Sequence, residues 1–428
     1  MDTSNAFIPR DKYGIVFIIF LIQGVGTLLP WNMFITANDY YVDYKFNPPN
    51  ATETSESFRS NYLAYVGIAS KFPNLALQAA NFVVKAGSDS IGQRIFISLA
   101  IQIVVFIFTM VMAFLNTFGW ITLFFILTIL SLILINMANG VYQSCLFACA
   151  ANLPRSYTNA IVTGMNISGT FASIVLILSL VISPNQRMAA ICYFAMAVLF
   201  LIICFLCQFA LVQNKFFRYF QDTTHADRKQ FLKSGEKGDE PEEEREDERS
   251  TKAFVRIFPR IWLAAFNNFM VMFVSLSVFP SVIANTKSID HWVPDKFFSP
   301  IFCFLSFNLF AVIGNLLPNH LPMTNKQGRM FILILSRILF IPFFLLCNYN
   351  PTNRKWPVIF SSDIYPVGGC IFLALTSGYF SSSVQMNMPK LVDLKDAPIA
   401  GMMASFSCML GILAGVSVAP ILSHIVNL

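Results

Sequence analysis

Aspartate and glutamate are absent from every long apolar stretch of this 428-residue chain. Charged residues make up only 12% of the sequence and hydrophobic residues 56%, whereas a soluble domain carries about a quarter charged residues. A helix of about 20 apolar residues crosses the core of a bilayer, and eleven stretches reach that length. This composition predicts a membrane protein without the usual carboxylate for a proton relay across the membrane.

The chain also lacks the motifs of membrane enzymes, metal sites and ion channels. It contains no H-E-x-x-H motif and no serine–histidine arrangement, and no ring of charges suits an ion filter. The nine cysteines all fall inside apolar stretches, and the C-x-x-C of Cys204 and Cys207 has no second pair. We therefore expect no enzymatic activity, no bound metal and no cofactor. The four histidines lie in loops or near a span end: His225, His291, His320 and His424.

The predicted fold is an all-α membrane protein with eleven transmembrane helices in a 6+5 two-bundle arrangement. The predicted spans are 13–36, 61–84, 95–115, 119–150, 158–182, 189–213, 257–284, 298–317, 330–350, 366–388 and 398–424. Residues 214–256 form the only long hydrophilic stretch, whose acid-rich composition predicts a disordered cytoplasmic loop. This loop separates an N-terminal bundle of six spans (1–213) from a C-terminal bundle of five (257–428).

Basic residues and one glycosylation signal give the same orientation. Lysines and arginines near span ends are more numerous on the side of the N-terminus, which favours a cytoplasmic N-terminus and an extracellular C-terminus. Asn50-Ala51-Thr52 is an acceptor sequence for N-glycosylation in the first loop, which then faces outward. A chance occurrence of this tripeptide remains the alternative.

Polar side chains recur at helical spacing inside several spans. Lys71, Asn74, Gln78 and Asn81 share one face of the span 61–84. Interhelical hydrogen bonds, worth about 0.6–2 kcal/mol each, explain single residues of this kind, whereas stripes on five spans favour a hydrated central cavity for an uncharged, hydrogen-bonding solute. The other stripes consist of Asn136, Asn139, Gln143, Asn159, Thr163, Asn166, Thr170, Ser173, Asn308, Asn315, Ser377, Ser381 and Gln385.

Lys71 is the most informative single residue, because it lies near the middle of its span. A lysine at the centre of a membrane helix costs about 2.5–3.5 kcal/mol on insertion scales. We expect it to face the cavity or a polar partner, in a substrate-contacting or gating role or in a structural one. It is also the only side chain there that could titrate if strongly desolvated, which keeps proton coupling open as an alternative.

The segment from Gly24 to Ala37, GVGTLLPWNMFITA, closely resembles the signature of equilibrative nucleoside transporters. Further matches follow in order along the chain, and the resemblance covers essentially all eleven spans. They include Leu153-Pro154, Phe307-Asn308-Leu309-Phe310, Arg337-Ile338-Leu339-Phe340-Ile341-Pro342, Gly378-Tyr379 and Pro389-Lys390. The resemblance implies a major-facilitator-like fold and the movement of nucleosides down their gradients by alternating access.

The resemblance also implies roles for individual residues. Gln143 matches a glutamine that reads the nucleobase, and Arg94 matches part of an inner gate whose acidic partner is unclear, with Asp396 as a nearby substitute. The implied substrate-binding residues are Leu28, Trp31, Lys71, Asn74, Gln143, Asn308, Ala311, Asn315 and Ile412. The implied gates are Ile35, Phe279 and Pro280 on the outer side and Asn32 and Arg94 on the inner side.

The chain departs from the family pattern in the eighth span. Many members carry an aspartate and an arginine that engage the substrate, where this chain has Ala311 and Asn315. We hypothesise that part of the positive charge has moved to Lys71, so that Lys71→Met should reduce uptake far more than Asn81→Ala. The missing pair makes a transporter of nucleobases or of another small heterocycle, possibly proton-coupled, the alternative reading.

The expected partners follow from the resemblance. We expect a small-molecule nucleoside such as adenosine or uridine as the substrate, lipid around the spans, and no nucleic acid. The expected protein is a monomeric, multi-pass uniporter of the plasma membrane.

Overall fold

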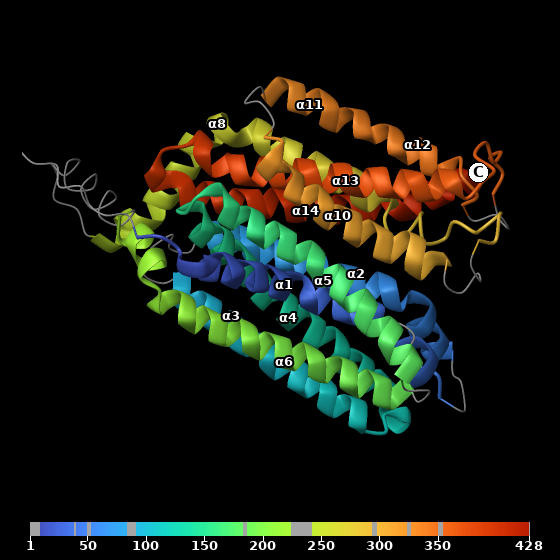
Figure 1. Cartoon of the computed structure of the whole chain (residues 1–428). Coiled ribbons are helices and arrows are strands. Elements are labelled where there is room, and N and C mark those ends of the chain that lie inside the picture. Colours follow the sequence, from blue (N-terminus) through green and yellow to red (C-terminus); the bar gives the residue numbers. More distant parts are fainter. Residues whose placement is uncertain are drawn as a thin grey trace, which may run out of the picture.

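The computed structural model of the chain describes residues 9–37, 40–48, 53–83, 91–182, 186–223, 242–292, 298–322, 327–349 and 354–427. Long helices that run roughly side by side make up most of this part of the chain (Figure 1). Outside the helices, an isolated antiparallel bridge joins Thr286 to Tyr349.

The N-terminal half of the chain contains long helices joined by short connections. They are α1 (Ile15–Thr36), α2 (Glu53–Val83), α3 (Ile91–Phe114), α4 (Ile121–Ala151), α5 (Arg155–Ile182) and α6 (Gln186–Gln213). Short helical segments accompany them: η1 (Lys12–Gly14), η2 (Tyr40–Lys45) and η4 (Phe118–Trp120).

The C-terminal half repeats this organisation with more interruptions. Its helices are α8 (Glu242–Val278), α10 (Ser306–His320), α11 (Gln327–Ser336), α12 (Phe340–Leu345), α13 (Ile364–Asn387) and α14 (Ala397–Asn427). The segment η5 (Ser299–Leu305) leads directly into α10, and η6 (Arg337–Leu339) joins α11 to α12. The segments η7 (Met388–Leu391) and η8 (Leu394–Asp396) connect α13 to α14.

In the described part of the chain, nine helical stretches are long and apolar enough to cross a membrane. Helices α2 and α5 contain 31 and 28 residues and match these stretches in length. Large aliphatic side chains on the outer faces of the helices, such as Ile97, Leu130 and Leu206, are more than half exposed, as expected for side chains that face lipid. The prediction of an all-helical membrane protein is confirmed.

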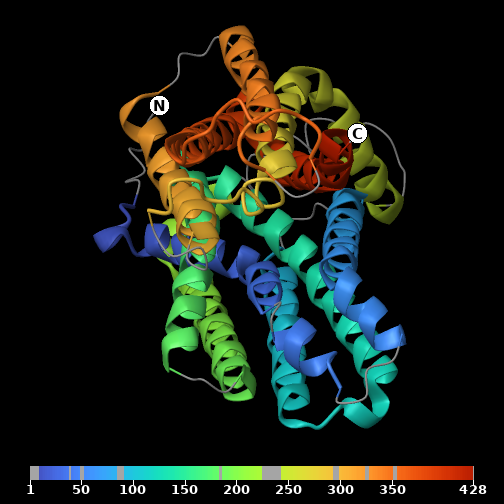
Figure 2. The ribbon, with the colours of Figure 1, turned by 90° about the vertical axis from the view of Figure 1, so that its right-hand side faces the viewer.

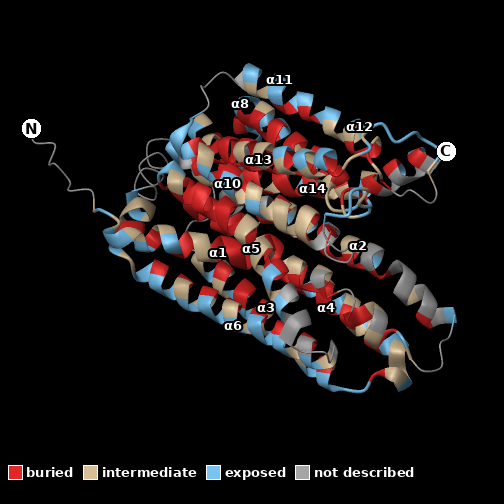
Figure 3. Cartoon of the chain, turned by 45° about the vertical axis from the view of Figure 1, so that its right-hand side comes forward, coloured by how far each residue is buried: buried red, intermediate tan, exposed pale blue. Residues whose placement is uncertain are grey.

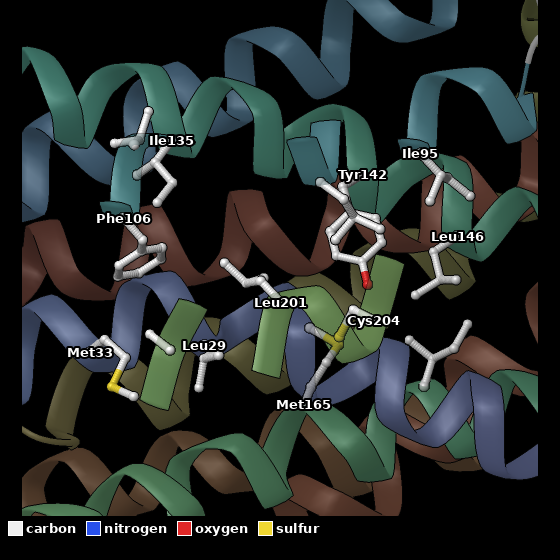
Figure 4. Packing of buried hydrophobic residues seen from close by; sticks show 14 of the residues in the cluster. Leu29, Met33, Ile95, Phe106, Ile135, Tyr142, Leu146, Met165, Leu201 and Cys204 are labelled. Atoms are coloured by element: carbon white, nitrogen blue, oxygen red, sulfur yellow. The ribbon is translucent and has the colours of Figure 1, made fainter. Parts of the chain in front are cut away.

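Most buried apolar side chains gather in clusters within one half, but Met402 of α14 belongs to the N-terminal cluster and Ile412 of α14 packs with Leu75 of α2. One cluster joins α1 to α6 and includes Tyr142 and Cys204, which lie close together in Figure 4. Two further clusters join α8 to the helices that follow it. Figure 2 shows the yellow-to-red helices above the blue-to-green helices, and the two sets meet where α14 contacts α4 and α10 contacts α5.

We name the two ends of the molecule after α1: the Ile15 end carries its start and the Thr36 end carries its last residue. Successive long helices alternate in direction. The end of α14 therefore lies at the Thr36 end, opposite the start of α1 (Figure 3).

One prediction about the central loop is wrong in part. Residues 215–223 are helical and α8 begins at Glu242, inside the segment 214–256 that was expected to be disordered. The sequence begins this helix with three glutamates, and acidic residues at a helix start are favourable. Residues 224–241 lie outside the described residues.

Candidate functional site

Lys71 of α2 and Trp31 of α1 are in direct contact. The ammonium nitrogen lies 3.6 Å from the centroid of the indole ring, and the Lys71 side chain is only 3% exposed. A cation in this position is attracted by the ring face, by about 2 kcal/mol or more when it is desolvated. No described residue accepts a hydrogen bond from the ammonium or forms an ion pair with it. The predicted cavity-facing lysine is thus buried with donors to spare.

A chain of amides continues from Lys71 along the same face of α2. Gln78 donates a hydrogen bond to Asn74 within α2 (2.7 Å) and accepts one from Ser405 of α14 (3.0 Å). All three residues are buried. The backbone of Asn74 is also covered by Gly140 of α4, where any side chain would collide with it. The predicted stripe is thus buried, and the bond from Ser405 to Gln78 links it to the C-terminal half of the molecule.

Gln143 of α4 lies one turn beyond Gly140 and is completely buried. Among the described residues, neither its amide nitrogen nor its amide oxygen has a hydrogen-bond partner. Buried polar atoms are nearly always paired with protein or with water, so this amide is a candidate partner for a solute. Other buried atoms without a partner among the described residues include both amide atoms of Gln102, Oδ1 of Asn139, Asn159 and Asn267, Oγ1 of Thr163 and Oε1 of Gln385.

The polar residues of α10 are placed differently from one another. Asn308 is half-buried against Gly169 of α5 and donates to the carbonyl of Phe304 (2.8 Å). Asn315 is fully buried, donates to the carbonyl of Val162 on α5 (3.2 Å) and accepts a hydrogen bond from Ser382 of α13 (3.0 Å). The amide of Asn315 is thus already occupied by the protein.

The apolar residues predicted to line the substrate site lie on α1, α10 and α14. Leu28 is half-buried and precedes Trp31 by one turn of α1. Ile412 of α14 is buried together with Leu75 of α2. Ala311 is buried, and its backbone carbonyl lies against Gly378 of α13.

The predicted outer gate combines residues of α1 and of the segment after α8. Phe279 stacks on Phe307 of α10, with ring centroids 3.9 Å apart and an angle of 9° between the planes. Pro280 and Ile35 are half-buried, and Ile35 lies next to the last residue of α1. All three side chains therefore belong to the Thr36 half of the molecule.

The structure does not bring the residues of the predicted inner gate together. Arg94 lies at the Ile15 end and donates to Asn81 of α2 (2.8 Å), whereas Asn32 lies 17 residues into α1 and donates to Ser168 of α5 (3.1 Å). A separation of 17 helical residues corresponds to about 25 Å, so Asn32 sits toward the opposite end from Arg94. Asp396 pairs with Arg256 (2.9 Å), which lies at the start of the apolar part of α8.

Arg337 of η6 is hydrogen-bonded to two neighbouring helices. It is buried and donates to the carbonyls of Val271 and Leu373 and to the hydroxyls of Ser275 and Thr376, at 2.8–3.2 Å. Its guanidinium therefore joins η6 to α8 and α13.

The glycosylation signal at Asn50 lies outside the described residues. The structure shows no group of three or more metal-binding side chains within the ranges it describes. The described cysteines are all free.

The sequence is similar to known transporters over almost its whole length. The family model described as "Nucleoside transporter" matches residues 129–424. Equilibrative nucleoside transporter 2 of Mus musculus is 30% identical, over 98% of this chain and 98% of that protein. Equilibrative nucleoside transporter 1 of Homo sapiens is 27% identical, over 97% of this chain and 98% of its own length.

Solved structures with little sequence similarity share the fold. The Escherichia coli fucose:proton symporter aligns with a TM-score of 0.57 at 11% identity, over 97% of this chain and 92% of its own. The human organic anion transporter MFSD10 aligns with a TM-score of 0.55 at 14% identity, over 96% and 93% of the two chains. The expected major-facilitator-like fold is therefore found.

Proposed function

The chain belongs to the nucleoside transporter family, and from that premise we propose that it carries nucleosides across a membrane, down their gradient, by alternating access. The observation that carries this proposal is the fully buried amide of Gln143, whose two polar atoms lack any partner in the described structure. A primary amide offers both a donor and an acceptor, which is what the edge of a nucleobase needs.

The remaining parts of the proposed site suit a neutral, partly aromatic solute. Leu28 and Trp31 supply an apolar and aromatic surface for the base. Asn74 and Asn308 supply amides nearby, and Ile412 supplies an apolar wall. Gln143 then fixes the orientation of the base through directional hydrogen bonds, because a buried polar group discriminates strongly between solutes that pair with it and solutes that do not.

We infer a two-bundle mechanism with eleven crossings, six before the loop 214–256 and five after it. At the Ile15 end, Gly401 of α14 packs against the backbone of Phe147, and Lys390 donates to the carbonyl of Leu153 (3.3 Å). Toward the Thr36 end the two sets of helices diverge in Figure 1. These contacts support a carrier that is closed at the Ile15 end, and rocking of one bundle against the other would open it there.

Transport down a gradient is favoured over proton coupling because the apolar stretches contain no carboxylate. We propose a multi-pass, monomeric protein of the plasma membrane with the Ile15 end in the cytoplasm, so that Asn50 faces outward and carries a glycan. Removal of the glycan by an endoglycosidase would shift the electrophoretic mobility of the wild type and not of Asn50→Gln.

The test is uptake of radiolabelled adenosine and uridine into proteoliposomes that contain the purified chain. We expect saturable uptake, acceleration by unlabelled nucleoside on the far side, and no accumulation above equilibrium under an imposed pH gradient. Uptake that never saturates would contradict a carrier, and concentrative uptake driven by the pH gradient would contradict a uniporter.

A second candidate function is the transport of free nucleobases. Ala311 and Asn315 favour it, since the position of the charged pair holds a small residue and an amide that the protein itself occupies. Competition of adenosine uptake by adenine, hypoxanthine and uracil distinguishes the two. Inhibition by free bases at concentrations similar to those of the nucleosides would favour the second function.

A further inference from the structure

We propose that Lys71 selects among nucleosides by the acceptors on the base, so that bases with an oxo group (inosine, uridine) are carried in preference to their amino counterparts (adenosine, cytidine). This inference rests on the proposed function, because it concerns the substrate of the same site. It starts from a buried charge that the protein leaves without an acceptor.

The ammonium of Lys71 has three donors and makes one contact of note, with the ring of Trp31 at 3.6 Å. The apolar stretches hold no aspartate or glutamate that could approach it. Arg337, another buried cation, shows the contrast, because carbonyls and hydroxyls of α8 and α13 accept its hydrogen bonds. A buried charge is tolerated when it is paired. The ammonium of Lys71 can therefore donate hydrogen bonds to acceptor atoms of a bound solute.

The position of Lys71 places such a solute at the base. Trp31 is the aromatic surface of the proposed site, and the ammonium lies on it. Gln143 is the free amide on the neighbouring helix: Asn74 lies one turn from Lys71, Gly140 packs on Asn74, and Gln143 follows Gly140 by one turn. The two groups are therefore about 9 Å apart along the helices, a distance that a purine nucleoside can span.

The chemistry of the base edge then decides which nucleosides fit. The N7 and O6 atoms of a 6-oxopurine are adjacent acceptors, and lysine is a common donor to this pair. In adenosine the same edge presents N7 beside an amino group, whose hydrogens would face the ammonium. Uridine offers the O4 acceptor where cytidine carries an amino group. An ammonium donates and never accepts, so it disfavours each amino base relative to its oxo counterpart.

The experiment compares two matched pairs of substrates in the wild-type protein. Uptake of labelled inosine, adenosine, uridine and cytidine into proteoliposomes gives kcat/KM for each. One well-placed contact of this kind discriminates by about tenfold or more, so we expect inosine to exceed adenosine, and uridine to exceed cytidine, by about that factor. Ratios of one, or a preference for the amino bases, would overturn the proposal.

Variants assign the preference to Lys71. Lys71→Met removes the donor and should bring both ratios close to one, whereas Lys71→Arg keeps a cation and should retain a preference for the oxo bases. Lys71→Gln, whose amide both donates and accepts, replaces Lys71→Met if the latter fails to reach the membrane, and it should also lose the preference. A preference that survives loss of the charge would reject the role of Lys71.

Lys215→Met is the matched control, because it removes one exposed lysine outside the site and should leave both ratios as in the wild type. Asn81→Ala is unsuitable for this purpose, since Asn81 accepts a hydrogen bond from Arg94 (2.8 Å) and donates to Ser144 (2.7 Å). If the wild type moves none of the four nucleosides in a saturable way, the proposed function itself fails. Saturable uptake with equal rates leaves that function intact and overturns only the selection by Lys71.

Discussion

Asn315 of α10 donates its side-chain amide to the main-chain carbonyl of Val162 on α5, across 3.2 Å. The hydroxyl of Ser382 on α13 donates to the oxygen of the same amide at 3.0 Å. A residue that family resemblance places at the substrate therefore bridges the two halves of the protein. In this structure Asn315 links α10 to α5 and α13, and its amide is not free to bind a solute.

Asn315→Ala should destabilise the protein without altering its selectivity. The change leaves the carbonyl of Val162 and the hydroxyl of Ser382 buried without a partner, at a cost of about 1–3 kcal/mol. Thermal unfolding of the purified variant should therefore occur at a lower temperature, while the relative KM values for different nucleosides stay as in the wild type. An unchanged unfolding temperature together with a changed order of KM values would contradict this prediction and indicate that Asn315 contacts the substrate.

Gln143→Leu should reduce transport without destabilising the protein. The wild-type amide has no partner in the described structure, so an apolar side chain of similar size leaves no group unsatisfied, and the empty protein should unfold at the same or a higher temperature. Because the hydrogen bonds to the base are lost, kcat/KM for nucleosides should fall about tenfold or more.

The control for Gln143→Leu is Asn268→Leu. The amide nitrogen of Asn268 donates to the carbonyl of Ala404 (2.7 Å) and to the hydroxyl of Ser407 (3.0 Å). Its replacement should lower the unfolding temperature of the empty protein. A loss of stability in both variants would mean that Gln143 is structural.

The helices and the polar stripes could be predicted from the sequence because both depend on local periodicity. The span 119–150 corresponds to α4 (Ile121–Ala151), since the length of a bilayer-crossing helix is set by the bilayer. The placement of Lys71 and Asn74 on one buried face follows from their spacing alone. Gln78 belongs to the same stripe, and this was the available signal for its bond to Ser405.

The pairing of side chains between helices could not be predicted in this way. Arg94 pairs with Asn81 and Asp396 pairs with Arg256. Tertiary packing determines which helix ends are neighbours at the Ile15 end, and therefore which side chains can pair there. The distance between Asn32 and Arg94 along the helix axes likewise depends on the direction in which each helix runs. The start of α8 at Glu242 was missed because acid-rich composition suggests disorder even where charges favour a helix start.

Gly401→Val should interfere with closure of the Ile15 end. A side chain at Gly401 would meet the carbonyl of Phe147 and the side chain of Ala151 on α4, so the two helices would be held apart. We expect transport to fall strongly while the protein still folds. A cysteine placed at Ala151 should become reactive toward a water-soluble maleimide applied at the Ile15 end in this variant.

Gly328→Val provides the control for that experiment, because the site of a side chain at Gly328 meets no other atom within 4 Å. It should leave both transport and labelling unchanged. Normal transport by Gly401→Val would contradict a seal between α4 and α14.

A pair of aspartates ties the connections at the Thr36 end to one another. Asp363, just before α13, is buried and accepts hydrogen bonds from the hydroxyl of Ser288 (2.5 Å) and from the N–H groups of Ile289 (2.8 Å) and Asp290 (3.2 Å). Asp290 in turn accepts from the hydroxyl of Ser362 (2.7 Å) and the N–H of Asp363 (2.8 Å). The segment that follows α8 is thereby fastened to the start of α13.

These bonds make the stability of the Thr36 end depend on pH in a defined direction. The hydroxyl of Ser362 and then the N–H of Asp363 lower the pKa of Asp290 below its usual value. A carboxylate whose folded pKa is lowered stabilises the protein above its unfolded pKa, about 3.9, and this contribution is lost as the pH falls through the lower folded value. Asp290→Asn should therefore unfold at a lower temperature than the wild type at pH 7 and at pH 5, and the difference should shrink only below about pH 4. Thermal unfolding of both proteins across this range is the measurement, and a difference that has already vanished at pH 5 would show that these hydrogen bonds do not hold the carboxylate in its charged form.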